Sequence, residues 1–122
     1  MRTPLFYILD GKIAKQCNSV LEWGQWMEEN SIRVARDYID EIEVSTVFLG
    51  LNHNWSDQGD PLLFETMSFW PNDSSKSERW RYFTWEEAEA GHREMVDEIK
   101  KMIVNANDRA DKSIQKLFKQ NS

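Results

Sequence analysis

Cysteine is nearly absent from this sequence, because Cys17 is the only one among 122 residues. A single cysteine excludes an intramolecular disulfide framework and is typical of proteins that fold in a reducing compartment. We interpret Cys17 as a small buried side chain, since no basic neighbour marks it as a reactive thiol. The sequence therefore predicts a cytoplasmic protein.

Long apolar runs are also missing. Near the N-terminus the apolar run covers only residues 5–9, whereas a membrane-spanning helix needs roughly 18–20 apolar residues. We therefore expect neither a signal peptide nor a membrane span.

Basic residues are outnumbered by acidic ones. The chain has 15 Lys and Arg against 21 Asp and Glu, which gives a formal net charge of −6. Direct binding to DNA or RNA is not expected, because that binding depends on many Lys and Arg contacts to phosphates. An acidic protein is better suited to contact a basic surface on a protein partner.

The common catalytic motifs are missing as well. With five glycines in the chain, there is no Gly-rich phosphate loop, no nucleophile elbow, no His-Glu-x-x-His pair and no cysteine cluster for zinc. We expect no cofactor and no metal. The absence of a complete catalytic motif favours a non-enzymatic function without deciding it.

Aromatic residues, by contrast, are abundant: six Trp, six Phe and three Tyr. Each buried ring removes roughly 150–250 Å² from water, so the chain has enough apolar surface for a core without disulfides. We expect one α+β domain over residues 1–105, followed by a helical C-terminal extension over residues 106–122.

The first third of the chain predicts a hairpin and a helix. Residues 5–9 and 12–16 are short strands joined by an Asp-Gly turn, which adopts the positive φ angles of two-residue hairpin loops. Ser19 followed by a glutamate three residues later forms a capping box and predicts a helix over residues 19–29. The side chains expected to face the core are Leu21, Trp26 and Met27.

The middle of the chain predicts four further strands, because runs rich in β-branched and aromatic residues are separated by segments with turn signals. These strands cover residues 32–39, 42–51, 62–70 and 79–83. The expected fold class is α+β: an antiparallel sheet of about five to six strands, with a helix after the first hairpin and a long C-terminal helix packed on one face.

The C-terminal helix has the clearest signal. Thr84 and Glu87 form a second capping box, and apolar residues then recur at steps of three and four. The stripe comprises Trp85, Ala88, His92, Met95, Val96, Ile99, Met102 and Ile103. We interpret His92 as a hydrogen-bonded core residue. From residue 105 the pattern thins, which is compatible with a continuation of this helix or with a separate short helix whose end frays.

The polar loop over residues 52–60 is one candidate site, because loops after buried strands often carry function. In a functional interpretation His53 is a general base or ligand, with Asp57 or Asp60 as its partner. The alternative is that the His, Asn and Asp side chains satisfy backbone groups of the turns.

Glu65 is a second candidate, since a carboxylate within an apolar strand is costly unless a cation pairs with it. Arg79 or Arg81 on the last strand would supply that cation. A buried Glu65 near His53 would suit acid–base chemistry. The alternative places Glu65 on the solvent face of the strand in a cross-strand ion pair.

Five aromatic residues gather around the last two strands and their loops: Trp55, Trp70, Trp80, Tyr82 and Trp85. If exposed, they would form a partner-binding patch or stack on a nucleotide. If buried, they belong to the core. Trp55 and Trp70 adjoin loops and are the expected exceptions to burial.

Three stretches together resemble small proteins encoded by bacteriophages and by bacterial genomes that carry prophages. They are residues 45–54 (STVFLGLNHN), 62–67 (LLFETM) and 81–92 (RYFTWEEAEAGH). The chain departs from that group in residues 71–78, which lack a Gly-rich turn, and in the tail after residue 105. The resemblance implies a phage setting and a host cytoplasm, but no mechanism.

Two functions of different classes fit this setting. In the first, the protein binds and inhibits a host factor, such as a defence nuclease of the CRISPR type, through an acidic and aromatic surface. In the second, it binds a small molecule or nucleotide, with or without hydrolysis, in a pocket that contains His53 and Glu65. The binding residues expected across the two are His53, Trp55, Asp57, Glu65, Trp70 and Arg81. Oligomerisation stays open.

Overall fold

The computed structural model describes residues 5–56 and 58–120, with side chains as far as Leu117. The strands are β1 (Tyr7–Asp10), β2 (Ile13–Gln16), β3 (Arg33–Ile39), β4 (Ile42–Phe48), β5 (Phe64–Phe69) and β6 (Arg79–Tyr82). The helices are α1 (Val20–Glu29) and α2 (Trp85–Gln120), with a short 3-10 turn η1 (Ser74–Lys76) before β6. The expected α+β class and order of elements are confirmed.

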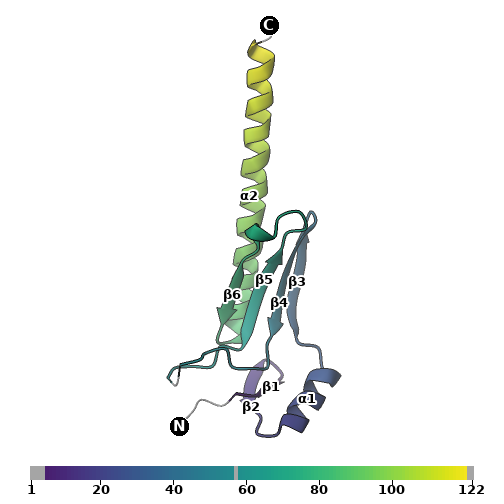
Figure 1. Cartoon of the computed structure of the whole chain (residues 1–122), viewed down its shortest axis with the longest axis vertical. Coiled ribbons are helices and arrows are strands. Elements are labelled where there is room, and N and C mark those ends of the chain that lie inside the picture. Colours follow the sequence, from purple (N-terminus) through teal and green to yellow (C-terminus); the bar gives the residue numbers. More distant parts are fainter. Residues whose placement is uncertain (1–4, 57, 121–122) are drawn as a thin grey trace.

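The six strands form two antiparallel sheets rather than one. Strands β1 and β2 make a hairpin, and the larger sheet has the order β3-β4-β5-β6. An isolated bridge between Phe6 and Leu51 and a hydrogen bond from the Tyr7 N–H to the Gly50 carbonyl (2.9 Å) attach the hairpin to the lower end of the larger sheet. Helix α2 packs along one face of that sheet (Figure 1).

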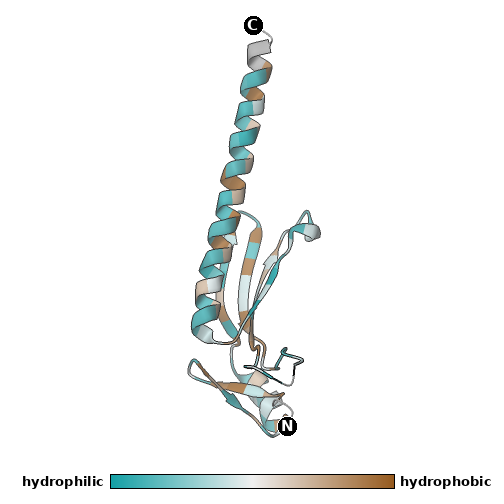
Figure 2. Cartoon of the chain, turned by 90° about the vertical axis from the view of Figure 1, so that its left-hand side faces the viewer, coloured by the Kyte–Doolittle hydropathy of each residue, from teal (hydrophilic) through white to brown (hydrophobic). Residues whose placement is uncertain are grey.

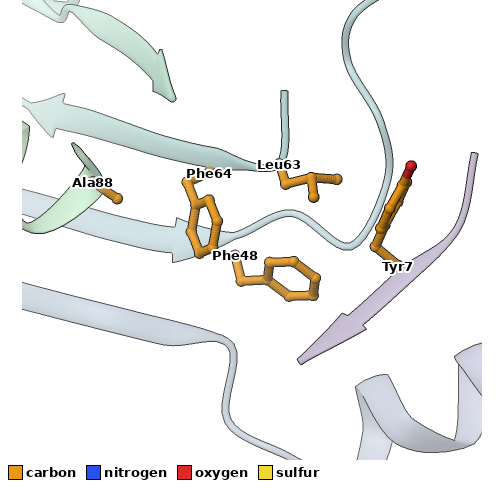
Figure 3. Close-up of a cluster of buried hydrophobic side chains, with 5 residues drawn as sticks. All are labelled: Tyr7, Phe48, Leu63, Phe64 and Ala88. Atoms are coloured by element: carbon orange, nitrogen blue, oxygen red, sulfur yellow. The ribbon is translucent and has the colours of Figure 1, made fainter. Parts of the chain in front are cut away.

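The core has two connected parts. At the lower end, the hairpin meets the sheet around Tyr7, Phe48, Leu63, Phe64 and Ala88 (Figure 3), and the Phe48 and Phe64 rings lie 5.3 Å apart. Further up, side chains of the sheet pack against α2 in a second cluster. Its buried members are Ile42, Val44, Met95, Val96 and Ile99.

The stripe predicted for α2 forms most of this interface. Ala88, His92, Met95, Val96 and Ile99 are buried, while Trp85 and Ile103 are partly buried. The expectation for Met102 is wrong, because its side chain is 49% exposed. At 100° per residue Met102 lies only about 20° from the buried Met95, but it is two turns further along α2, close to where the helix leaves the sheet (Figure 1).

Both predicted helix caps are present. The Ser19 hydroxyl accepts from the Glu22 N–H, and the Thr84 hydroxyl accepts from the Glu87 N–H. Within α1, the expectation for Leu21 is wrong, because this side chain is 86% exposed. The Trp23 indole N–H donates to the Gly50 carbonyl (3.0 Å) and so fixes the rotation of α1, turning Leu21 away from the core.

Helix α2 continues without a break past residue 105. Its 36 residues span about 54 Å at 1.5 Å per residue, and its second half extends beyond the end of the sheet (Figure 1). Of the two alternatives for the tail, the structure has the continuous helix. Within the described ranges, no helix is both long enough and apolar enough to cross a membrane.

Candidate functional site

The larger sheet has one covered and one open face. In β4, Val44, Thr46 and Phe48 are buried towards α2. Because successive strand residues point to opposite faces, their neighbours project to the other side. Figure 2 shows α2 along one side of the sheet, and no described helix or strand lies over the opposite side. We call that side the open sheet face.

The open sheet face combines arginines with apolar and aromatic residues. Strand register places three rows across it: Arg33, Val47, Glu65 and Arg81; then Arg36, Ser45, Met67 and Arg79; then Tyr38, Glu43 and Phe69. Four arginines therefore face two glutamates. The surface has an excess of positive charge although the chain as a whole carries −6.

Glu65 is held in the middle of this surface by two arginines. Its Oε2 lies 3.0 Å from Nε of Arg81 and 3.5 Å from Nε of Arg79, and its side chain is 11% exposed. Arg81 is also its cross-strand partner in the register of β5 and β6. Of the two interpretations, the cross-strand ion pair on the outer face is confirmed.

The other arginines of the open sheet face are tied to β4. Nε of Arg36 lies 3.2 Å from the Glu43 carboxylate, and Arg33 donates to the Ser45 hydroxyl at 2.8 Å. These pairs hold the guanidinium groups close to the strands, and such partly exposed pairs contribute about 0–1 kcal/mol each. They orient the arginines more than they stabilise the fold.

Two aromatic rings remain exposed beside the arginines. Tyr38 is 61% exposed and Phe69 is 45% exposed, and both flank Glu43 in the third row. Arginine and aromatic side chains are the types that carry most of the binding energy in protein interfaces. The open sheet face is thus the surface best equipped for binding.

Acidic residues gather on the opposite side of the molecule. The first four turns of α2 expose Glu86, Glu87, Glu94, Asp97 and Glu98, against one exposed basic residue, Arg93. The two layers therefore carry opposite charges: acidic on the outer side of α2 and basic on the open sheet face. The exposed rings Tyr38 and Phe69 lie on the basic side, whereas the sequence predicted a surface that is both acidic and aromatic.

The loop over residues 52–60 is organised by its own amides. The Asn52 side-chain oxygen accepts from the N–H groups of Asn54 (2.8 Å) and Leu62 (3.1 Å), and Asn54 donates to two loop carbonyls. Nδ1 of His53 lies 2.9 Å from the Leu51 carbonyl. These contacts fit the interpretation of the polar side chains as turn-forming. Asp57 lies outside the described residues.

His53 and Glu65 are not brought together in the described part of the chain. The His53 ring contacts Trp55 edge to face, with centroids 6.0 Å apart, and no hydrogen bond joins it to the Glu65 carboxylate. Trp55 is 80% exposed, as expected. Of the candidate residues that the structure describes, His53 and Trp55 lie in this loop, whereas Glu65 and Arg81 are paired on the open sheet face.

Trp70 is less exposed than Trp55. Its ring packs against the upper core cluster, with the Lys76 ammonium 5.2 Å from its centroid. Its indole N–H donates to the Ser68 hydroxyl at 3.3 Å. Trp80, Tyr82 and Trp85 also pack against the core clusters. Only Trp55 among the five predicted aromatic residues extends largely into solvent.

A buried polar chain joins α2 to the sheet. His92 bonds through Nε2 to the Asp37 carboxylate (2.7 Å) and through Nδ1 to the Thr46 hydroxyl (2.7 Å), which in turn lies 2.5 Å from the Thr66 hydroxyl. Because a carboxylate only accepts, Nε2 carries the proton, and in the neutral ring Nδ1 accepts from Thr46. His92 is a hydrogen-bonded core residue, as predicted.

This polar chain has the residue types of a catalytic nucleophile, base and orienting group, but a substrate could not reach its hydroxyls. Thr46 and Thr66 are both completely buried, so no substrate reaches either hydroxyl. The Tyr82 hydroxyl lies near Thr66, at the end of this polar chain, and has no hydrogen bond of ordinary geometry. Thr66 nevertheless opposes part of the effect of burial on the Tyr82 pKa. Burial raises the pKa of Tyr82 above its usual value. The polar chain is a structural device.

A cavity of about 380 Å³ lies between the hairpin, residues 60–64 and the start of α2. Its walls are mostly apolar, including Tyr7, Ala14, Leu63 and Phe83, with Lys12 and Glu86 among its polar groups. Neither His53 nor Glu65 lines it. Its volume falls within the range of small-molecule pockets, about 300–1,000 Å³.

Comparison with protein-family models, with curated proteins and with solved structures gave no match. Among the residues that the structure describes, no group of three or more His, Cys, Asp or Glu side chains is arranged to hold a metal ion.

Sequence reasoning missed much of the open sheet face. It named Arg81 and Glu65, but not Arg33, Arg36 or the exposed Tyr38. A signal was present in β3 and β6, where charged and aromatic residues alternate with residues of the covered face. That alternation becomes informative only when the register of the four strands is known.

Proposed function

We propose that this protein is a non-catalytic binding protein that engages an acidic surface of a host protein through its open sheet face. The observation that carries the proposal is the row arrangement of Arg33, Arg36, Arg79 and Arg81 beside the exposed rings of Tyr38 and Phe69. Arginines supply charge complementarity, and the rings supply apolar contact at low entropic cost.

A protein partner fits this surface better than a nucleic acid. Two of the four arginines are neutralised by Glu43 and Glu65, and nucleic-acid affinity depends on the number of phosphates contacted. The net charge of −6 also repels a polyanion at longer range. The resemblance to phage and prophage proteins supports a host origin for the partner, which the protein would block by occupying its surface.

A defence nuclease as the target, which is the narrower expectation, would require a different contact surface. The nucleic-acid site of a nuclease is basic, so it would contact the acidic outer side of α2 rather than the open sheet face. A contact on the open sheet face would indicate a partner with an acidic surface, and a contact on the outer side of α2 would indicate a nuclease. The two surfaces lie on opposite faces, so a single experiment separates them.

The test begins with affinity capture of host proteins, followed by measurement of binding to the recovered partner. The Tyr38→Ser/Phe69→Ser variant should bind at least about tenfold more weakly, because loss of interface anchors costs about 1–2 kcal/mol or more. Leu21→Ser is the matched control, since Leu21 is 86% exposed on α1, away from this surface. Equal loss in both variants, or no loss in the first, would contradict the proposal.

Small-molecule binding is a second candidate, and the 380 Å³ cavity beside the start of α2 favours it. Ala14 lines this cavity, so Ala14→Leu should fill part of it. If the cavity is used, a screen of mononucleotides and small carboxylates should give a thermal shift that Ala14→Leu abolishes. Absence of any shift in the unmodified protein would exclude these ligands.

A further inference from the structure

The distal half of α2, residues 103–117, carries an apolar stripe that the domain leaves largely uncovered. We call this segment the arm. Ile114 is 50% exposed and Leu117 is 61% exposed. Figure 2 shows hydrophobic bands continuing up the helix beyond the sheet. The stripe comprises Ile103, Ala106, Ala110, Ile114 and Leu117.

These five residues lie on one narrow side of the helix. At 100° per residue they fall within about 40° on either side of Ala110. The same side of α2 carries Val96 and Ile99, which pack against the sheet. The stripe is therefore a direct continuation of the interface between α2 and the sheet, and it extends past the point where the sheet ends.

The stripe is symmetric about Ala110. Ala106 and Ile114 lie four residues to either side, and Ile103 and Leu117 lie seven residues to either side. A two-fold axis at Ala110 would therefore pair each position with its mirror position on an antiparallel copy. Isologous contacts of this kind are the rule in homodimers.

The sizes of the paired side chains also match. Antiparallel pairing sets Ile114 of one copy against Ala106 of the other, and Leu117 against Ile103. Large residues thus meet small ones near the centre, where the Ala110 pair lets the helices approach closely. This alternation of large and small residues is what interdigitated packing requires.

The sheet decides the direction of the pairing. A parallel copy would extend its own helix down into the space that the sheet already occupies, because stripe and sheet lie on the same side of α2. An antiparallel copy points its own sheet the other way: with Leu117 opposite Ile103, only the last described turn of its helix reaches the level of the cluster that includes Ile103. The antiparallel direction therefore avoids most of this overlap.

Charge is also complementary at the level of the upper end of the sheet. The β3–β4 turn carries Asp40 and Glu41, and the adjoining Ile39 and Ile42 pack in the cluster that includes Ile103. Antiparallel pairing brings Lys116 of the second copy to the level of residue 104, which is the level of this acidic turn along the axis of α2. Antiparallel pairing also places Arg109 of one copy beside Arg109 of the other, and the repulsion between these exposed like charges costs a few tenths of a kcal/mol.

We propose that the arm is a self-association element, and that two copies of this chain pair through antiparallel arms centred on Ala110. The proposal does not depend on the function of the open sheet face. Its consequence is a dimer whose two sheets lie at opposite ends of the paired arms. Such a dimer presents two binding surfaces and gains avidity for a partner with repeated sites.

Sedimentation of the full chain over a wide range of concentrations tests the proposal. We expect a transition from 14.5 kDa to twice that mass. Ile114→Lys and Leu117→Lys should each weaken the dimer by at least about tenfold, because each substitution occurs twice in the interface. Gln115→Lys adds the same charge about 140° from the stripe and should leave the dimer intact.

Disulfide trapping tests the direction and register. In a Cys17→Ser background, mixing Ala106→Cys with Ile114→Cys should give the mixed disulfide in preference to either homodimer. A parallel pair would instead join position 106 to itself. A chain that stays monomeric at every concentration, an equal effect of Gln115→Lys, or a preference for the 106–106 bridge would each overturn the proposal.

Discussion

Helix α2 approaches Tyr82 of the sheet closely at Gly91, and this contact gives a quantitative prediction. A Cβ atom at this position would lie 2.1 Å from the Tyr82 hydroxyl oxygen and 2.2 Å from its Cζ. Carbon atoms in good contact are about 3.5–4.0 Å apart, so the overlap exceeds 1 Å. Either the ring of Tyr82 or the whole helix must move.

Gly91→Ala should therefore destabilise the protein although alanine favours helices. Overpacking costs about 1–3 kcal/mol, and the gain in helix propensity is at most about 1 kcal/mol. Gly24→Ala in α1 is the matched control, because its Cβ meets nothing within 4 Å. This control should gain about 0.5–1 kcal/mol, and because both variants share that gain, the difference between them is the overpacking cost of about 1–3 kcal/mol.

Urea denaturation monitored by circular dichroism measures both free energies of unfolding. A double-mutant cycle with Tyr82→Val assigns the cause, because valine lacks the hydroxyl oxygen and the two ring carbons that would clash. In that background Gly91→Ala should cost far less than in the unmodified protein. If Gly91→Ala stabilises as Gly24→Ala does, or costs the same in both backgrounds, the packing described for α2 is wrong.

Three further predictions concern the buried polar groups. His92→Ala should lower the free energy of unfolding by about 2–4 kcal/mol, because it opens a cavity and removes both bonds of the imidazole, while affinity for the partner should be retained; a loss below about 1 kcal/mol would contradict the polar chain. Tyr82→Phe should be neutral or stabilising by up to about 1 kcal/mol in urea denaturation, because its buried hydroxyl lacks a good hydrogen bond; marked destabilisation would show that the hydroxyl is well bonded. Burial raises the pKa of Tyr82 above 10.0, so above that pH the unfolded chain loses its proton first and stability falls. Tyr82→Phe should reduce this alkaline loss in pH-dependent denaturation, leaving the part due to Tyr7, whose pKa burial also raises; an unchanged alkaline slope would refute the assignment.

The local signals of the sequence predicted the elements well. The capping residues Ser19 and Thr84 marked both helix starts, and runs of β-branched and aromatic residues bounded by turn signals marked the strands. The division into two sheets was not predictable in the same way, because the hairpin is attached to the larger sheet by contacts distant in sequence, such as the bridge between Phe6 and Leu51 and the bond from the Tyr7 N–H to the Gly50 carbonyl. Leu21 was misplaced for the same reason, since the rotation of α1 is set by a contact distant in sequence.

The candidate site depended still more on tertiary structure. Glu65 and Arg81 were paired correctly from cross-strand reasoning, because adjacent strands in an antiparallel sheet constrain each other. The bond of His92 to Asp37 joins residues 55 positions apart, and no local sequence pattern predicts it. The open sheet face likewise requires the register of all four strands.

Site-specific photo-cross-linking tests the central claim most directly. A photoreactive residue at Phe69 reports on the open sheet face, one at Ala90 reports on the exposed outer side of α2, and one at Leu21 is the control on α1. In nuclease-treated host lysate, we predict one discrete protein adduct from position 69 and none from positions 90 and 21. An adduct from position 90 alone, or an adduct at 69 that disappears on nuclease treatment, would contradict the account.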